Sequence, residues 1–230
     1  LGLNCLLVRT GTHNVLIETG IGDKFNAKYS DIYGIEKTTT LPVELKKAGL
    51  ALDDVDIVIN THLHFDHCGW NTRRENGRAV PTFPRARYFV QHGEWEHALH
   101  PTERDQASYV LEFFRPAEIR TELIEGSQEI IPGVRVEVAS GHTRDLQCVW
   151  IESEGQHACF ISDLVPTRAH LPYPWIMSFD LYPMDTLANR HRLLPQIVER
   201  DALVIFPHDP EVPWARLEES GGKMFAKPVI

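Results

Sequence analysis

Four side chains able to bind a metal ion lie within six residues of the sequence, in the segment THLHFDH at residues 61–67. His62 and His64 are two residues apart, so in an extended or turning segment both rings can face one point. Asp66 and His67 are adjacent and project differently, which lets them reach a second point. Imidazole nitrogens and carboxylates are ligands that Zn²⁺ accepts, and they also suit iron and manganese. Burying so many ionisable groups without a metal would be costly, so the segment predicts a metal site.

Three further candidate ligands follow apolar runs that read as strands, just as His62 follows the apolar run 56–60. They are His142 after Val134–Ala139, Asp163 after His157–Ser162, and His208 after Leu203–Phe206. Loops at strand ends, held by a rigid sheet, are where catalytic residues usually lie. We therefore expect these three side chains to join the four of the first segment in one site.

The elements that must position these ligands are mostly strands, with helices between them. Strands are predicted at Leu3–Arg9, Asn14–Thr19, Asp56–Asn60, Arg87–Gln91, Thr121–Glu125, Val134–Ala139, Cys148–Glu152, His157–Ser162 and Leu203–Phe206. Helices are predicted at Leu41–Ala48, Glu94–His100, Glu103–Phe114 and Asp185–Glu199. Helices packed on a sheet-rich core are the layered arrangement that this order favours.

Other segments carry turn and loop signals. The polar stretch Gly20–Thr40 and the Pro-rich and aromatic stretch Leu164–Pro183 are predicted to be loops. Pro195 should kink or end the last helix, because proline removes a helical hydrogen bond. The polar tail from Glu211 onward is predicted to be loose.

Composition excludes several classes of protein. The 230 residues are 43% hydrophobic and 24% charged, which is ordinary for a soluble globular protein and suits one domain over residues 1–230. No apolar run approaches the roughly 18 residues that a membrane helix needs. The formal net charge of −9 argues against a nucleic-acid partner, since phosphate binding needs a basic surface. The chain starts at Leu1 inside an apolar run, so we expect some N-terminal sequence to be missing, and we favour the cytoplasm.

The four cysteines are predicted to be reduced thiols, because a chain of this size does not need disulfides and contains no CxxC pair. Cys68 directly follows His67 in the motif. The ligand set is complete without it, so we interpret it as a small packing residue.

The motif HxHxDH followed by a separate His, Asp and His resembles that of the metallo-β-lactamase-fold hydrolase superfamily, over Leu3 to His208. The resemblance implies an α/β (α+β) fold, an αββα four-layer sandwich with the site at one edge of its two sheets. It also implies two divalent metal ions, with zinc favoured and iron, manganese or cobalt as alternatives. One ion would be held by His62, His64 and His142, and the other by Asp66, His67 and His208, with Asp163 as the bridge.

The implied chemistry is hydrolysis by attack of a metal-bound hydroxide. Two metals roughly 3.5–4 Å apart share a water, lower its pKa and polarise the substrate oxygen. The resemblance gives catalytic roles to Asp163 as the bridge and to Asp66, which is chiefly a ligand and also assists proton transfer. The segment HLHFDHCGWNT and the N-terminal hairpin are most similar to the branch that contains N-acyl-homoserine-lactone lactonases and related esterases.

The predicted function is therefore that of a dinuclear metal-dependent hydrolase acting on a small-molecule lactone or other carboxylic ester. A phosphotriesterase or phosphodiesterase activity on the same site is the alternative within the class. A metal-bearing regulatory module without hydrolytic activity, or an iron redox protein, is the alternative from another class. A homodimer is implied by the resemblance alone.

Two positions depart from the family pattern. The usual GHTPGH motif reads GHTRDL here, so its second histidine is replaced by Leu146. This changes which group orients His142. The quorum-quenching lactonases carry a tyrosine three residues after the bridging aspartate, where this chain has Pro166. A contact to a substrate oxygen is thus missing or comes from another residue.

Substrate contacts are predicted in the aromatic segment after Asp163. Tyr173, Trp175 and Met177 could line an apolar pocket, and Tyr33 in the early polar stretch is a similar candidate. The alternative, weighed equally, is that the aromatic residues of the segment pack their loop onto the sheet.

Overall fold

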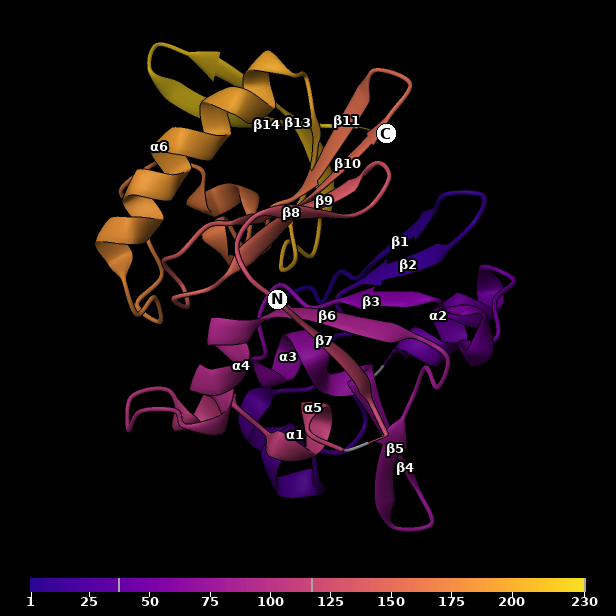
Figure 1. The fold of residues 1–230 in the computed structure, drawn as a ribbon. Coiled ribbons are helices and arrows are strands. Elements are labelled where there is room, and N and C mark those ends of the chain that lie inside the picture. Colours follow the sequence, from indigo (N-terminus) through magenta and orange to yellow (C-terminus); the bar gives the residue numbers. More distant parts are fainter. Residues whose placement is uncertain (37, 117, 230) are drawn as a thin grey trace. The chain divides into compact units, whose positions relative to one another are not determined.

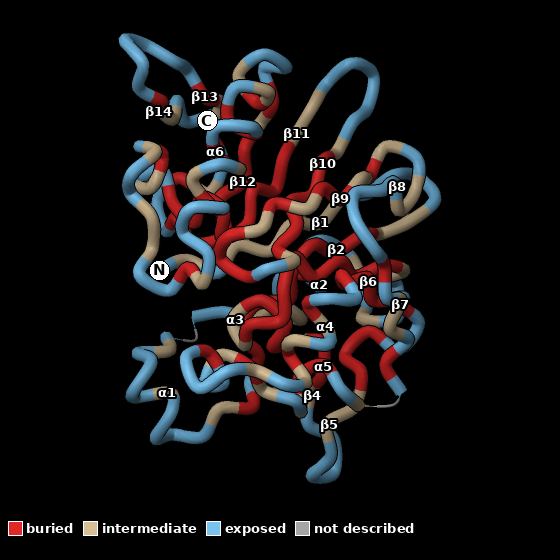
Figure 2. Tube along the Cα trace, turned by 60° about the vertical axis from the view of Figure 1, so that its left-hand side comes forward, coloured by how far each residue is buried: buried red, intermediate tan, exposed pale blue. Residues whose placement is uncertain are grey.

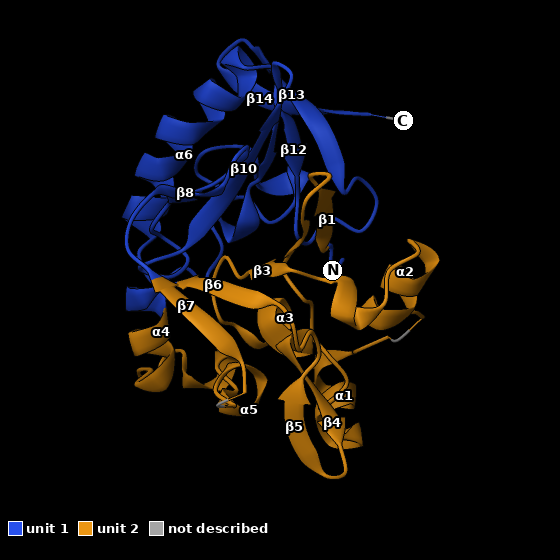
Figure 3. Cartoon of the chain, turned by 45° about the vertical axis from the view of Figure 1, so that its right-hand side comes forward, with its two compact units in different colours: residues 1–4, 91–94, 124–230 blue, residues 5–90, 95–123 orange. Residues whose placement is uncertain are grey.

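The computed structural model describes residues 1–36, 38–116 and 118–229, and it contains two compact units (Figure 3). Unit 1 consists of residues 1–4, 91–94 and 124–230, and unit 2 of residues 5–90 and 95–123. Each unit has its own β-sheet with helices, which confirms the α/β class and the presence of two sheets. The expectation of a single domain over the whole chain stays a prediction.

Unit 2 is built on a five-stranded sheet whose strand order is β1-β2-β3-β6-β7 (Figure 1). These strands are β1 (Leu6–Arg9), β2 (Asn14–Ile17), β3 (Ile57–Ile59), β6 (Arg87–Gln91) and β7 (Arg120–Ile124). The first two form an antiparallel hairpin, whereas β2, β3 and β6 run parallel. All three residues of β3 are buried, as expected of a strand covered on both faces. The parallel order brings the ends of β2 and β3 to the same edge.

The helices of unit 2 pack around this sheet in two apolar clusters. They are α1 (Ala27–Tyr33), α2 (Leu41–Lys47), α3 (Phe65–Cys68), α4 (His92–Leu99, whose first turn belongs to unit 1) and α5 (Leu111–Phe114), and a hairpin is formed by β4 (Thr72–Glu75) and β5 (Arg78–Pro81). Leu45 of α2 packs with Leu16 and Val58 of the sheet. Cys68 of α3 packs with Leu63 and Phe113, which holds the short motif helix in place.

Unit 1 is built on a seven-stranded sheet covered by the long helix α6 (Pro183–Glu199). The strands are β8 (Gln128–Ile131), β9 (Val134–Val138), β10 (Gln147–Ser153), β11 (Gln156–Phe160), β12 (Leu203–Ile205), β13 (Trp214–Ser220) and β14 (Lys223–Pro228). Alternate residues such as Cys148 and Trp150 pack against Leu193 and Ile197 of α6. Figure 2 shows that the buried residues concentrate on the strands, while the hairpin tips are exposed.

Three predictions about local structure are wrong. The stretch Gly20–Thr40 contains α1, whose first turn is capped by the Asn26 side chain accepting the Tyr29 N–H at 3.0 Å. The predicted helix Glu103–Phe114 is instead a 3₁₀ turn followed by the short α5. There the Asp105 carboxylate accepts the N–H and the hydroxyl of Thr102, a local turn that competes with helical hydrogen bonds.

The third error concerns the C-terminal tail. The tail after Glu211 forms the β13–β14 hairpin, closed by Gly221 and Gly222 with φ of 57° and 75°. Two consecutive glycines with positive φ suit the two-residue turn that matches the strand twist. Helix α6 continues through Pro195 to Glu199, so the proline does not end the helix, because Leu194 and Ile197 beside it are buried in the core of unit 1; a kink at Pro195 stays a prediction. Their burial offsets the cost of the proline.

Two global features follow from the described residues. None of their helices combines the length and the apolar character that crossing a membrane would require.

The four cysteines are free thiols, and Cys68 donates to the Leu63 carbonyl at 3.4 Å within an apolar cluster. Cys68 therefore packs, as predicted.

A buried lysine stabilises the segment that follows α3. The side chain of Lys24 is in unit 2, where its ammonium donates to the carbonyls of Gly69 and Thr72 and lies 4.3 Å from the ring centre of Phe113. Burial lowers its pKa to about 8, an effect that the nearby Asp23 carboxylate partly opposes. The folded chain therefore releases this proton at a lower pH than the unfolded chain does.

We expect Lys24→Met to change the pH dependence of stability. Between a pH of about 8 and about 10.4, the unfolded chain keeps the Lys24 proton and the folded chain has lost it. The parent protein should therefore become more stable relative to the variant as the pH rises across this window. The difference between their free energies of unfolding should change by about 1–3 kcal/mol. Urea unfolding at several pH values measures this, with exposed Lys28→Met as the control. A constant difference between parent and variant would contradict the assigned pKa.

Candidate metal centre

The first ligand segment leaves the buried edge of β3 and turns directly into α3. His64 occupies the N-cap position, and its carbonyl accepts the N–H of His67 at 3.0 Å. This turn gathers three imidazoles: the ring centres of His62 and His64 are 4.6 Å apart, and those of His62 and His67 are 4.0 Å apart. Asp66 lies on the same helix, with Oδ2 3.8 Å from His67 Nε2. All four motif ligands are thus close together within unit 2.

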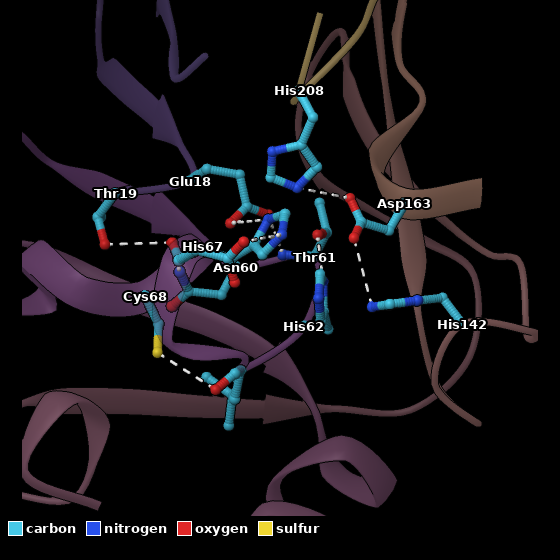
Figure 4. Close-up of polar contacts among 12 residues, drawn as sticks. Glu18, Thr19, Asn60, Thr61, His62, His67, Cys68, His142, Asp163 and His208 are labelled. Atoms are coloured by element: carbon cyan, nitrogen blue, oxygen red, sulfur yellow. Dashed lines mark hydrogen bonds and ion pairs between the residues drawn. The ribbon is translucent and has the colours of Figure 1, made fainter. Parts of the chain in front are cut away.

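Glu18 holds this segment from the end of β2. Its buried carboxylate accepts the Thr61 N–H at 2.7 Å with one oxygen, and the other lies 3.2 Å from His67 Nδ1 (Figure 4). The residue has a φ of 64°, a left-handed conformation that is uncommon for glutamate. The Glu18 carboxylate therefore lies beside Nδ1 of His67, which leaves Nε2 as the nitrogen available for coordination. The only sequence signal for Glu18 is that it is a charged residue directly after the apolar run NVLI, and this signal does not single it out as a functional residue.

The remaining three ligands meet within unit 1. Asp163 follows β11 and presents one oxygen to each of two imidazoles: Oδ2 is 3.3 Å from His142 Nε2, and Oδ1 is 3.2 Å from His208 Nε2 (Figure 4). All three side chains are at most 6% exposed. A carboxylate whose two oxygens face different histidines has the geometry that a bridging ligand requires.

The histidines of unit 1 are oriented by acceptors at Nδ1. Asp180 Oδ1 lies 3.0 Å from His142 Nδ1, and the Gly2 carbonyl oxygen lies 3.0 Å from His208 Nδ1. A carbonyl and a carboxylate only accept, so both histidines carry hydrogen on Nδ1 and turn Nε2 toward Asp163. No local pattern marks Asp180 or Gly2, since they lie 38 and 206 residues from their partners.

Asp209 joins the two loops that carry Asp163 and His208. Its carboxylate accepts the backbone N–H groups of Arg168, Glu211 and Val212 at 2.9–3.1 Å. Burial opposes its ionisation, but these hydrogen bonds outweigh burial and hold the pKa of Asp209 below its usual value. The His208 N–H also donates to the Pro166 carbonyl at 2.9 Å. The loops after β11 and β12 are therefore fixed to each other.

The donor chemistry fits divalent metal ions. Every one of the seven predicted ligands belongs to a group of His and Asp side chains that could hold a metal: His62, His64, Asp66, His67, His142, Asp163 and His208. Imidazole nitrogens and carboxylate oxygens suit zinc, and equally iron, manganese or cobalt. Five imidazoles and two carboxylates, most of them buried, are costly to place in the interior without a cation.

The predicted substrate residues lie in two separate segments. In unit 1, Trp175 is 61% exposed, and Tyr173 stacks on His191 at 3.9 Å between ring centres. In unit 2, Tyr33 belongs to an aromatic group and lies 4.9 Å from Phe65, the residue before Asp66. Met177 is partly exposed. Their roles stay predictions, and the stacking of Tyr173 favours packing for that ring.

Tyr109 is an aromatic neighbour of the ligands that the sequence pattern did not single out. Its ring is 7% exposed and lies 4.9 Å from the ring centre of His64. On another side it lies 5.6 Å from His97, whose Nε2 contacts Asp105 at 2.5 Å. Tyr109 therefore lies between the candidate ligand His64 and the partly buried pair His97–Asp105, all within unit 2.

Comparisons with known proteins agree with this donor set. A family model described as the Metallo-beta-lactamase superfamily matches residues 1–208, and its last matched residue is the last predicted ligand. An N-acyl homoserine lactonase of Bacillus thuringiensis is 28% identical over 222 residues, which cover 90% of this chain and 81% of that protein.

Solved structures give the same result. A probable metal-dependent hydrolase from Staphylococcus aureus has a TM-score of 0.89 at 26% identity, covering 99% of this chain and 83% of its own. An N-acyl homoserine lactone hydrolase, solved with N-hexanoyl-L-homoserine at its catalytic metal centre, has a TM-score of 0.70 at 27% identity. That match covers 90% of this chain and 81% of the other. The predicted sandwich architecture is thereby confirmed.

Glu18→Gln should weaken metal binding. The amide keeps the size of the side chain but removes the negative charge that holds Nδ1 of His67, and loss of such a partner costs about 10–100-fold in metal affinity. Competition with a chromophoric chelator measures the affinity, and exposed Glu103→Gln in the same unit is the matched control. Equal affinities in the parent and both variants would show that Glu18 only stabilises the loop.

Proposed function

Because the chain belongs to the metallo-beta-lactamase superfamily and has lactonases among its relatives, we propose that it is a dinuclear metal hydrolase that cleaves a lactone or another carboxylic ester. The single observation that carries the proposal is Asp163, whose two oxygens each face a different ligand histidine. This arrangement fits a carboxylate that is shared by two metal ions.

The seven donors divide into two sets in this proposal. His62, His64 and His142 would hold one ion, and Asp66, His67 and His208 the other, with Asp163 shared by both. When bound, the two ions supply a water of lowered pKa and a Lewis acid for the carbonyl oxygen. Zinc is favoured, because tetrahedral and five-coordinate sites of histidine and aspartate are typical of catalytic zinc.

The protein's own carboxylates have different tasks in the reaction. Hydrolysis breaks the bond between the acyl carbon and the alkoxy oxygen, so a proton from the attacking water must reach the leaving oxygen. Asp66 is suited to hold that proton, because its side chain is 26% exposed, whereas that of Asp163 is 6% exposed. Asp163 is buried between two imidazoles and would serve as a ligand shared by both ions.

The apolar residues near the ligands favour a carboxylic ester as substrate. Phe65 lies next to Asp66 in the sequence and packs against Tyr33, while Trp175 and Met177 follow Asp163 along the chain. We assign Tyr33, Trp175 and Met177 to contacts with the apolar part of the ester, whereas Tyr173, which stacks on His191, packs its loop. A phosphotriester or phosphodiester remains the alternative within the class, since the same ions would bind a phosphoryl oxygen.

Elemental analysis together with a substrate panel tests the proposal. We expect about two metals per chain, and turnover of small lactones or aryl esters that falls to background with chelator and returns when metal is added. The panel includes a phosphotriester and a phosphodiester to rank the two chemistries. About one iron per chain without hydrolysis would favour the redox alternative, and Asp163→Asn should abolish turnover if the bridge is correct.

Trp175→Ala tests the substrate side. If the exposed indole contacts the ester, its removal should raise KM about tenfold or more and leave kcat nearly unchanged, because binding in the ground state and in the transition state weakens equally. Steady-state kinetics on the best lactone of the panel measures this, with exposed Trp214→Ala as the control. An unchanged KM for every substrate would remove Trp175 from the site.

A further inference from the structure

The departure at Leu146 left open which group orients His142. Leu146 is fully buried in the apolar cluster of unit 1, with Trp150 and Leu193, so it contributes no polar contact. We propose that Asp180, in the segment before α6, is the positioning residue of His142 and ties the aromatic segment 171–184 to the metal centre. This inference rests on the proposed function, because it takes His142 as a metal ligand.

The Asp180 carboxylate is fully buried and engaged at both oxygens. Oδ1 lies 3.0 Å from His142 Nδ1, and Oδ2 accepts the Thr186 hydroxyl at 2.6 Å. The second bond fixes the plane of the carboxylate, since Thr186 lies in the first turns of α6. Asp180 therefore sets both the tautomer and the direction of the His142 ring.

The same segment also holds the backbone of His142. The His142 carbonyl accepts the Leu181 N–H at 3.2 Å, and the Gly141 carbonyl accepts the Tyr182 N–H at 2.8 Å. Gly141 has a φ of 155°, and a Cβ there would come within 2.2 Å of Thr186 Oγ1. Helix α6 thus packs directly against the residue before the ligand, which leaves the loop little freedom.

A buried arginine balances the charge of Asp180. The Arg190 side chain is fully buried, and burial lowers its pKa to about 10, an effect that Asp180 partly opposes. Its guanidinium donates to the carbonyls of Leu164 at 2.8 Å and Trp175 at 2.8 Å. The chain from the residue after Asp163 to the aromatic segment is therefore held by one buried guanidinium.

Glu18 and Asp180 act in the same way on different ions. Glu18 faces Nδ1 of His67, and Asp180 faces Nδ1 of His142. In the proposed division of the donors, each ion then has one histidine supported by a carboxylate. Removing one carboxylate should lower the affinity of the protein for one ion and not for the other. General destabilisation of the fold does not produce such a selective loss.

The experiment compares Asp180→Asn with Glu18→Gln and with Asp185→Asn, which removes the same charge from an exposed position on α6. Metal-free protein is titrated with Co²⁺, and its absorption spectrum is recorded; Zn²⁺ affinity is measured by competition with a chromophoric chelator. We expect Asp180→Asn to lose about 10–100-fold in affinity for one ion only, with a changed cobalt spectrum. Glu18→Gln should affect the other ion, and Asp185→Asn should match the parent protein.

Thr186→Val gives a second test if Asp180→Asn does not fold. It removes the hydroxyl that fixes the carboxylate but keeps the shape of the side chain, so a smaller loss at the same ion is expected. Suppose that the parent protein binds two ions. If Asp180→Asn, or Thr186→Val where Asp180→Asn does not fold, then binds both ions with unchanged affinity and spectrum, the role of Asp180 is overturned and the proposed function stands. If the parent binds no ion, the proposed function itself fails.

Discussion

The structure depends on one constraint: imidazoles and carboxylates that must face a cation have to be buried without losing their hydrogen bonds. The chain meets this constraint by placing a fixed oxygen beside Nδ1 of each of three candidate ligand histidines. These oxygens belong to Glu18 for His67, Asp180 for His142 and the Gly2 carbonyl for His208. A ring held in this way presents Nε2 in one direction only. The direction is set before any ion binds, so the cost of ordering the ligands belongs to folding.

The strands explain why the acceptors can be where they are. In unit 2, β2 and β3 run parallel with Ile17 beside Ile59, so the residues after them, Glu18 and Thr61, meet at one edge. In unit 1, β11 and β12 run parallel with Phe160 beside Ile205, which brings the loops of Asp163 and His208 together. The same arrangement thus occurs once in each unit: a parallel pair places an acidic residue next to a ligand loop.

The candidate ligands could be picked out from the sequence because their identity and spacing are local, as in HLHFDH, and because they follow apolar runs; the structure brings them into groups that could hold a metal. The strands that carry them were also found, for the same reason. The supporting residues were not, since Asp180 is 38 residues from His142 and Glu18 is 43 residues from Thr61. Nothing near Asp180 in the sequence distinguishes it from a solvated aspartate. Helix α1 and the β13–β14 hairpin were missed because the polar composition of both segments is typical of loops. The local signals that favour these elements are the Asn26 cap and the Gly221–Gly222 turn.

In the proposed function, substrate specificity and metal binding are not independent. The residues between Asp163 and α6 hold the aromatic side chains, and the same residues carry Asp180 and contact Arg190. A substitution that reshapes this segment for another substrate therefore also moves the acceptor of His142. The departures at Leu146 and Pro166 are consistent with this coupling, because the lost histidine and the lost tyrosine both belong to the loops that this segment supports. Selection for a new substrate would then act on the ligand shell and the pocket together.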